Sequence, residues 1–258
     1  MKKTLKIVKV GGKLIEDESK LQAFLSDFSK LEGLKILVHG GGNMATEIAS
    51  KLGYETKMID GRRITDANSL KVIVMTYAGL INKRIVAKLQ ALDVNSIGLC
   101  GADGRSIISK KREVKEIDFG YVGDIEVVNS DFISSILEQG MVPVFSAISC
   151  TREGELLNTN GDSVAAELAK SLSENYDPEL YYCFEKKGVL ANSMDENSVI
   201  NTLDKKKYQD LLDQKAITDG MLPKLLNCFE ALENGVQKIF LGDARVITEN
   251  ANATEIVK

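Results

Sequence analysis

The stretch ILVHGGGNMATEIA, residues 36–49, places three consecutive glycines between an apolar run and an amphipathic segment. A buried strand that leads through glycines into a helix is typical of α/β proteins. Glycine permits a tight turn with positive φ, and it also leaves helix N-terminal N–H groups open to a phosphate. Taken alone, the triplet favours the plain turn. Asn43 is expected to cap the following helix, which Gly53 ends.

The same alternation of strand and helix continues along the chain. Buried strands are predicted in LKIVKV, KILVH, SIGLC, VPVFSAI, LYYCF and KIFLG. Helical periodicity predicts helices near 19–31, 43–52, 66–92, 130–139, 162–173, 204–214 and 222–234. Residues 105–129 alternate differently and predict a β-ribbon, a candidate flap over a pocket. We therefore expect an α/β fold with an open, mainly parallel sheet between helices and two lobes, 1–173 and 174–258, divided at the polar SENYDPE.

Composition excludes several classes of protein. With 258 residues, 44% of them apolar, the chain can fill a sizeable core. A net charge of -4 argues against a protein that coats nucleic acid or an acidic membrane surface. Four widely spaced cysteines and a single histidine argue against a zinc site. The lysine-interleaved N-terminus and the lack of an apolar run of about 20 residues predict a cytoplasmic protein without a membrane span.

Two lysines occupy positions where a positive charge is unusual. Lys9 interrupts the first predicted strand just before Gly11 and Gly12, at the strand end where ligands bind in open α/β sheets. Lys224 follows Pro223 in the first turn of a predicted helix, near the positive end of its dipole. Each lysine is also compatible with a solvated side chain. The combination of the two lysines with two glycine loops predicts an anion site.

Two polar clusters complete this pattern. Arg62 and Arg63 precede Thr65, a predicted helix cap, and an arginine fork can hold a carboxylate in two parallel hydrogen bonds. Asn158 and Asp162 flank the start of another predicted helix, where an aspartate either caps the helix or holds lysine side chains in position. Positive charge and preorganised N–H donors are what phosphoryl transfer demands. Neither a Ser/His/Asp nor a Cys/His triad is suggested.

The ordered motifs KVGGK, VHGGGN, GRRIT, NTNGD and ITDGMLPK closely resemble those of the amino acid kinase family over essentially the whole chain. GRRIT together with NTNGD resembles its acylglutamate branch. The resemblance implies ATP-dependent phosphorylation of the side-chain carboxylate of N-acetyl-L-glutamate, or a close N-acylglutamate, to an acyl phosphate in arginine biosynthesis. It also implies a homodimer insensitive to arginine. The alternatives are another acceptor, such as glutamate, aspartate, carbamate or UMP, and a regulatory binding protein without catalysis.

The resemblance also implies roles for single residues. Lys9 and Lys224 would stabilise the transferring γ-phosphoryl, and Asp162 would orient both ammonium groups. Phosphate oxygens would be bound by the backbone N–H groups of Gly11, Gly12, Gly41 and Gly42. The acylglutamate would be held by the side chains of Arg63 and Asn158. A side chain at Gly41 or Gly42 should block the phosphoryl more than it harms the fold. Mg²⁺ would be carried by ATP without protein ligands, the 1–173 lobe would bind acylglutamate and the 174–258 lobe ATP.

Two segments depart from the family pattern. CFEKKGVL stands where the family usually shows a Thr/Ser-Asp turn on the nucleotide lobe, so the nucleotide contacts around Phe184, Glu185 and Lys186 are not implied. The segment LGDARVITENANATEIVK is shorter than usual before its last predicted strand. The chain begins almost at the first strand, and the expected insensitivity to arginine follows from that position.

Overall fold

The computed structural model describes residues 2–59, 62–192, 194–213, 221–248 and 253–258. The chain divides into two compact units, of which unit 1 joins the residues up to Lys35 to Ala165–Lys258, and unit 2 is Ile36–Val164. This division differs from the expected boundary between 173 and 174. The physical reason is strand pairing, because the N-terminal strand lies in parallel register beside a strand of the C-terminal segment.

Unit 1 is built on a mainly parallel sheet. Its described strands follow the order β12 (Thr202–Leu203), β14 (Thr254–Ile256), β13 (Lys238–Gly242), β11 (Tyr176–Cys183) and β1 (Lys3–Val10). β1, β11 and β13 are parallel, and β14 is antiparallel to β13. The helical segments are α1 (Lys13–Glu16), α2 (Glu18–Lys30), α8 (Lys205–Asp213), α9 (Leu222–Glu233) and the short η3 (Ala244–Ile247). The four apolar residues of β1, Leu5, Ile7, Val8 and Val10, are completely buried, as expected for a strand of a parallel sheet covered by helices.

Unit 2 contains a parallel group of three strands, β2 (Leu34–His39), β8 (Val142–Ser146) and β5 (Ser96–Leu99). A second sheet has the order β10 (Leu156–Asn158), β9 (Ile148–Cys150), β6 (Ile107–Lys111) and β7 (Gly123–Val128). β3 (Met58–Ile59) and β4 (Arg62–Arg63) form a short antiparallel pair. The helical segments are α3 (Gly42–Lys51), α4 (Ala67–Val74), η1 (Met75–Ile81), α5 (Asn82–Gln90), η2 (Asp103–Arg105) and α6 (Ser130–Glu138), and α7 (Gly161–Leu172) begins in this unit.

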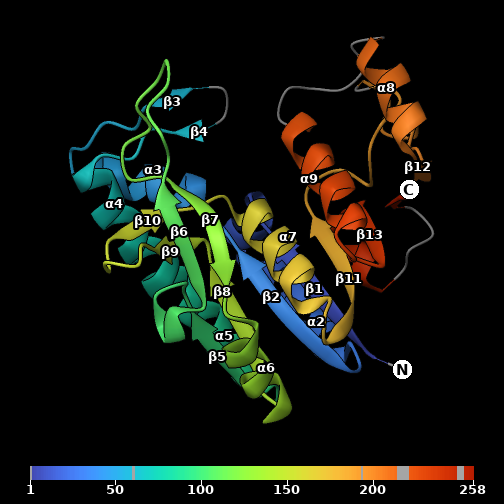
Figure 1. The fold of residues 1–258 in the computed structure, drawn as a ribbon, viewed down its shortest axis with the longest axis horizontal. Coiled ribbons are helices and arrows are strands. Elements are labelled where there is room, and N and C mark those ends of the chain that lie inside the picture. The colour runs from blue at the N-terminus through green and yellow to red at the C-terminus, as the bar shows by residue number, and fades with distance from the viewer. Residues whose placement is uncertain (1, 60–61, 193, 214–220, 249–252) are drawn as a thin grey trace. The chain divides into compact units, whose positions relative to one another are not determined.

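The predicted α/β class, with a mainly parallel sheet flanked by helices, is confirmed. Each of the six predicted strands overlaps an observed one, and the predicted helices end within a few residues of those observed. The predicted ribbon is the antiparallel pair β6 and β7, which Figure 1 shows as a long twisted hairpin whose connecting loop extends beyond the strands. Periodicity did not reveal the short elements α1, β3 and β4, which are too brief to repeat a pattern.

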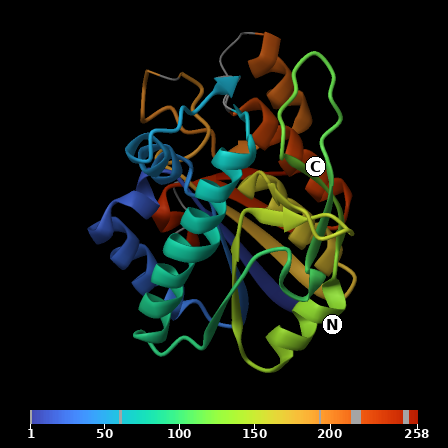
Figure 2. The same ribbon diagram turned by 90° about the vertical axis from the view of Figure 1, so that its left-hand side faces the viewer.

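The helix predicted over 66–92 is one continuous helical column with an irregular centre (Figure 2). Between α4 and α5, the segment η1 is π-helical, and the Asn82 N–H donates to the carbonyl of Tyr77, five residues earlier. A π-helical turn inside an α-helix is rare and frequently lies at a functional site. Its consequence here is that side chains five residues apart share one face.

Candidate functional site

Lys9 lies near the carboxyl end of β1, half-buried and opposite Tyr182 of the parallel strand β11. The chain then passes through Gly11 and Gly12 into α1. A Cβ atom at Gly11 would lie 2.8 Å from the Lys9 Nζ atom, so the absence of a side chain makes room for the ammonium group. Gly12 has a φ of 59°, which favours glycine. The strand and the glycine turn therefore fix where the Lys9 ammonium lies.

Lys224 approaches the same strand from α9. Its Nζ atom lies 4.9 Å from the centre of the Tyr182 ring and 5.8 Å from that of Phe184, within the range of cation–π attraction. Between these two aromatic residues lies Cys183, whose thiol is fully buried. Burial raises the pKa of Cys183 to about 12, and the positive charges of Lys9 and Lys224 both act in the opposite direction. Unit 1 thus brings the two predicted lysines to one place, the end of β11.

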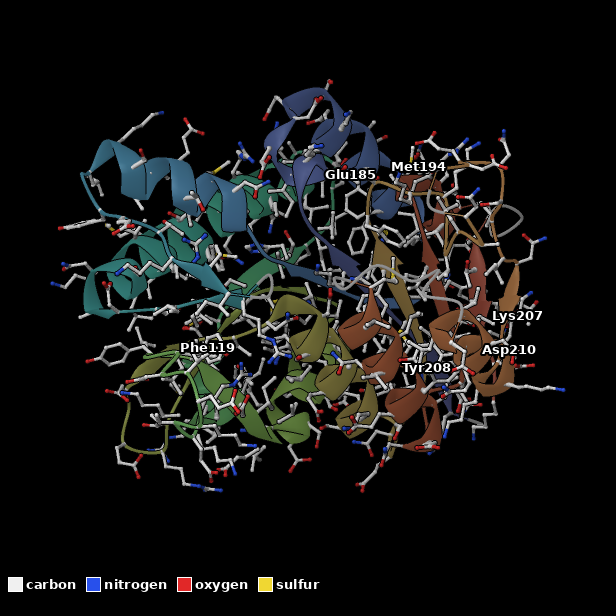
Figure 3. The ribbon with its side chains drawn as sticks, turned by 90° about the horizontal axis from the view of Figure 1, so that it is seen from above. Phe119, Glu185, Met194, Lys207, Tyr208 and Asp210 are labelled. Atoms are coloured by element: carbon white, nitrogen blue, oxygen red, sulfur yellow. The ribbon has the colours of Figure 1, made fainter. Side chains whose placement is uncertain are left out.

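The unexpected segment after β11 belongs to this place. The Phe184 N–H donates to the Gly242 carbonyl at the end of β13, and its ring lies near the Lys224 ammonium. The Glu185 carboxylate accepts a hydrogen bond of 3.3 Å from Lys13, and Figure 3 labels this side chain. Both groups of that pair are exposed, so the pair adds little stability. The aromatic contribution of Tyr182 and Phe184 was not predicted, because nothing in a strand pattern shows which lysine will cover a ring.

In unit 2 the glycine loop connects β2 to α3. Gly41 is buried with a φ of 155°, and a Cβ atom there would lie 3.2 Å from two ring carbons of Tyr77 and collide with the Ile81 side chain. A side chain at Gly41 would therefore disturb the packing as well as any approach of a ligand. Gly42 is exposed, and the nearest atom to an added Cβ is the Tyr77 hydroxyl at 3.8 Å. The N-cap residue of α3 is Gly41, and no side chain makes a capping hydrogen bond there. The prediction that Asn43 caps α3 is therefore wrong.

Arg63 binds the first turn of α3. Its Nη2 atom donates to the Gly42 carbonyl at 2.8 Å and to the Thr46 hydroxyl at 2.7 Å, and Nη1 donates to the Thr56 hydroxyl at 3.0 Å. Arg63 also acts against the rise in the pKa of the Tyr77 hydroxyl that burial causes. Gly41, Gly42 and Arg63 therefore form one local cluster. Arg62, by contrast, is exposed on β4 and lines a cavity of about 560 Å³ together with residues of the ribbon and its loop, among them Lys110 and Arg112.

Asn158 ends β10 and is tied to the same region through Thr65. The Asn158 amide nitrogen donates to the buried Thr65 hydroxyl at 3.0 Å. The Thr65 backbone bonds the ribbon loop, donating to the Phe119 carbonyl and accepting from the Tyr121 N–H. Phe119, labelled in Figure 3, is thereby held beside the segment that carries Arg63. The prediction that Thr65 caps α4 is wrong, since the cap is Asp66, whose carboxylate accepts from the Ser69 N–H at 2.7 Å.

Asp162 lies in the first turn of α7, where an acidic side chain suits the helix dipole. The capping function falls to Asn160 instead, because its Oδ1 atom accepts from the N–H groups of Asp162 at 2.7 Å and Ser163 at 3.2 Å. The alternative in which Asp162 is itself the cap is therefore wrong.

The predicted residues thus fall into two local groups, Lys9, Gly11, Gly12 and Lys224 in unit 1, and Gly41, Gly42, Arg63, Asn158 and Asp162 in unit 2. Within the described parts of the chain, no three His, Cys, Asp or Glu side chains gather as a metal site. No helix of the described residues is long and apolar enough to cross a membrane.

Comparison with known proteins gives one consistent result. The sequence profile of the Amino acid kinase family matches residues 4–243. An acetylglutamate kinase of Phocaeicola vulgatus is 50% identical over 251 residues, which cover 97% of this chain and 98% of that protein. An acetylglutamate kinase of Parabacteroides distasonis is 48% identical over 94% of this chain and 95% of its own. In fold, the chain is similar to N-acetylglutamate synthase of Neisseria gonorrhoeae complexed with coenzyme A and N-acetyl-glutamate, with a TM-score of 0.83 and 21% identity over 99% of this chain and 59% of that chain.

Proposed function

Because this chain belongs to the amino acid kinase family, we propose that it transfers the γ-phosphoryl group of ATP to the side-chain carboxylate of N-acetyl-L-glutamate. The observation that carries the proposal is the identity of about half of all residues to acetylglutamate kinases over nearly the full length of both chains. The product is an acyl phosphate, and the step belongs to arginine biosynthesis. We also propose that the enzyme is a cytoplasmic homodimer.

In this reaction a carboxylate oxygen forms a bond to the γ-phosphorus while the bond from that phosphorus to the β–γ bridging oxygen breaks. The carboxylate is already ionised near neutral pH, so no general base is needed. Catalysis then depends on positioning and on positive charge around the transferring group. We assign Lys9 and Lys224 to that charge, supported by their common place at the end of β11. Asp162 is assigned to orient the two ammonium groups.

The remaining predicted residues are assigned to binding. Backbone N–H groups of the two glycine loops bind phosphate oxygens, in the turns at Gly11 and Gly12 and at Gly41 and Gly42. Arg63 and Asn158, both in unit 2, are assigned to hold the acylglutamate. The hydrogen bond from Arg63 Nη2 to the Gly42 carbonyl supports this assignment, because it joins the residue assigned to the substrate to the loop assigned to phosphate. We assign Mg²⁺ to the ATP phosphates, whose charge it neutralises.

The direct test is hydroxylamine trapping of an acyl phosphate. Purified protein is incubated with ATP, Mg²⁺ and a panel of N-acetylglutamate, N-succinylglutamate, glutamate and aspartate. Hydroxamate should form with an N-acylglutamate and not with the free amino acids. Background levels with every N-acylglutamate would refute the proposed function, and a faster reaction with glutamate or aspartate would assign another acceptor.

Variants of the two lysines test the mechanism. Lys9→Ala and Lys224→Ala should lower kcat far more than they raise the KM for the acyl substrate, since the charge is needed mainly in the transition state. Lys6→Ala is the matched control, because Lys6 lies on the same strand but donates to the Glu32 carbonyl. A rise in KM at unchanged kcat would mean that the lysines serve substrate binding only. Arg63→Lys should instead raise KM, because the fork is lost while the charge remains.

A further inference from the structure

His39, the last residue of β2, is completely buried and lies directly before the glycine loop. Its Nδ1 atom is 2.8 Å from the Gly40 carbonyl oxygen, which can only accept, so Nδ1 carries the proton. Its Nε2 atom is 3.1 Å from the amide nitrogen of Asn82, which also lies 2.9 Å from the Val144 carbonyl oxygen. That second carbonyl requires the nitrogen of Asn82 to face inward, so Asn82 donates to Nε2. Both contacts specify the same neutral tautomer of His39.

The bond to Gly40 has a consequence for the next N–H group. In a planar trans peptide the carbonyl oxygen and the following N–H point in opposite directions. Because His39 holds the Gly40 carbonyl oxygen, the Gly41 N–H of the same peptide points away from His39. A histidine without this tautomer would lose the bond and release the peptide plane. The orientation of one proposed phosphate donor is therefore set by a buried imidazole.

The π-helical segment explains how Asn82 reaches His39. Tyr77 and Ile81 contact the Gly41 position, and Asn82 contacts His39, so these three side chains share one face. In an α-helix, with about 100° per residue, positions i, i+4 and i+5 spread over about 140°. With one more residue in each hydrogen-bonded turn, roughly 4.4 per turn, the same positions lie within about 80°. The bond from the Asn82 N–H to the Tyr77 carbonyl is the π-type bond that produces this arrangement.

We propose that His39 and Asn82, brought together by the π-helical segment Met75–Ile81, are positioning residues that direct the Gly41 N–H toward the transferring phosphoryl group. The inference rests on the proposed function for the identity of the group that binds at Gly41, a phosphoryl. The hydrogen bonds of His39 and Asn82 are independent of that function. Asn82 has its amide nitrogen fully used by His39 and Val144, and its Oδ1 atom accepts from Lys83 at 3.3 Å, so the network holds the imidazole in one orientation.

The first experiment measures the tautomer in the unaltered protein. His39 is the only histidine of the chain, so the ¹⁵N NMR spectrum of histidine-labelled protein reports on a single imidazole. We expect the tautomer that carries the proton on Nδ1 and none on Nε2. A proton on Nε2, or a rapidly exchanging mixture, would overturn the inference. This result is independent of any enzymatic assay.

The second experiment separates positioning from packing. In His39→Asn the amide group lies near the former Nδ1 atom and can still donate to the Gly40 carbonyl, whereas in His39→Gln it lies near the former Nε2 atom. We expect His39→Asn to retain a kcat at least about tenfold above that of His39→Gln, with the KM for acylglutamate changed less than about threefold in both. Equal kcat values would overturn the inference, because a purely structural role does not distinguish these two amides.

Asn82→Leu keeps a similar volume and removes both donors. It should lower kcat by about tenfold to hundredfold, less than the loss of about hundredfold to thousandfold that follows removal of a preorganised donor to the reacting group itself. Ser106→Ala is the control, since Ser106 is also completely buried in unit 2 but donates to the Cys100 carbonyl. It should lower the melting temperature and leave kcat unchanged. An unchanged kcat in Asn82→Leu would overturn the inference and leave the proposed function intact. Conversely, wild-type protein that is inactive with every N-acylglutamate would refute the proposed function. In that case the NMR measurement of the His39 tautomer would still test the geometry.

Discussion

Replacing Gly11 with alanine tests whether the position of the Lys9 ammonium controls the rate. The new Cβ atom would lie 2.8 Å from Nζ, whereas ordinary contacts begin at 3.4 Å, so the ammonium must move by about 0.6 Å or more. The backbone at Gly11 does not have a positive φ, and the displaced atom is the end of a flexible side chain. The variant should therefore fold with a loss of less than about 1 kcal/mol.

The effect on catalysis should be much larger than the effect on stability. A misplacement of about 1 Å can slow a reaction about hundredfold, so a shift of about 0.6 Å predicts a fall in kcat of about tenfold to hundredfold. The hydroxamate assay measures kcat and KM, and urea unfolding measures the free energy of unfolding. A wild-type kcat in a folded Gly11→Ala protein would refute the reasoning, because the ammonium would then be displaced without consequence.

A double-mutant cycle with Lys9→Met identifies the path of the effect. If the added methyl group acts only by moving the ammonium, Gly11→Ala should have little further effect once the ammonium is absent. The residual rate of the Lys9→Met protein must be measurable for this comparison, which long incubations provide. Additive losses in the double variant would show that the methyl group acts on something other than Lys9.

Four further changes have expected outcomes. Lys35→Met should lower the free energy of unfolding by about 2 kcal/mol without changing kcat, since the buried ammonium donates to three carbonyls at the end of α2. Asp66→Ala should cost about 1 kcal/mol at pH 7; the Ser69 N–H lowers the pKa of Asp66, so this difference should be full above pH 3.8 and vanish as the pH falls through the lowered pKa. Asn160→Ala should cost about 1 kcal/mol and also lower kcat, while Asn160→Asp retains both. Gly42→Ala should leave stability unchanged or raised by up to about 1 kcal/mol, yet lower kcat or raise the KM for ATP.

Much of the fold could be predicted because its strands are buried on both faces and its helices are long. Short apolar runs between amphipathic segments, such as KILVH and KIFLG, are typical of strands buried on both faces of a parallel sheet. The helix over 66–92 was predicted from the same periodicity, but its π-helical centre was not. One additional residue in a turn shifts the spacing of apolar positions only slightly. The contacts that this segment makes with Gly41 and His39 join residues that are distant in sequence, so local periodicity does not report them.

Residues of the candidate site could be predicted only where a charged side chain occupies a locally unfavourable position. Lys9 lies in a predicted buried strand and Lys224 at a predicted helix N-terminus, where a positive charge is unfavourable, and these positions predicted an anion site. Helix caps could not be assigned in the same way, since Asn43, Thr65 and Asp162 all suit a cap and a neighbour took that role each time. A shift of one or two residues decides a cap, and local composition does not determine it.

The glycine triplet separates the demands of the fold from those of a ligand. Only Gly41 is required by packing, because of its backbone conformation and the contacts of Tyr77 and Ile81. Gly40 has no atom within 4 Å of an added Cβ, and Gly42 has one at an ordinary distance. Alanine at Gly42 would even favour the helix that begins there. A glycine that the fold does not need, beside a carbonyl bound by Arg63 and a peptide plane held by His39, is best explained by a ligand that must approach the backbone.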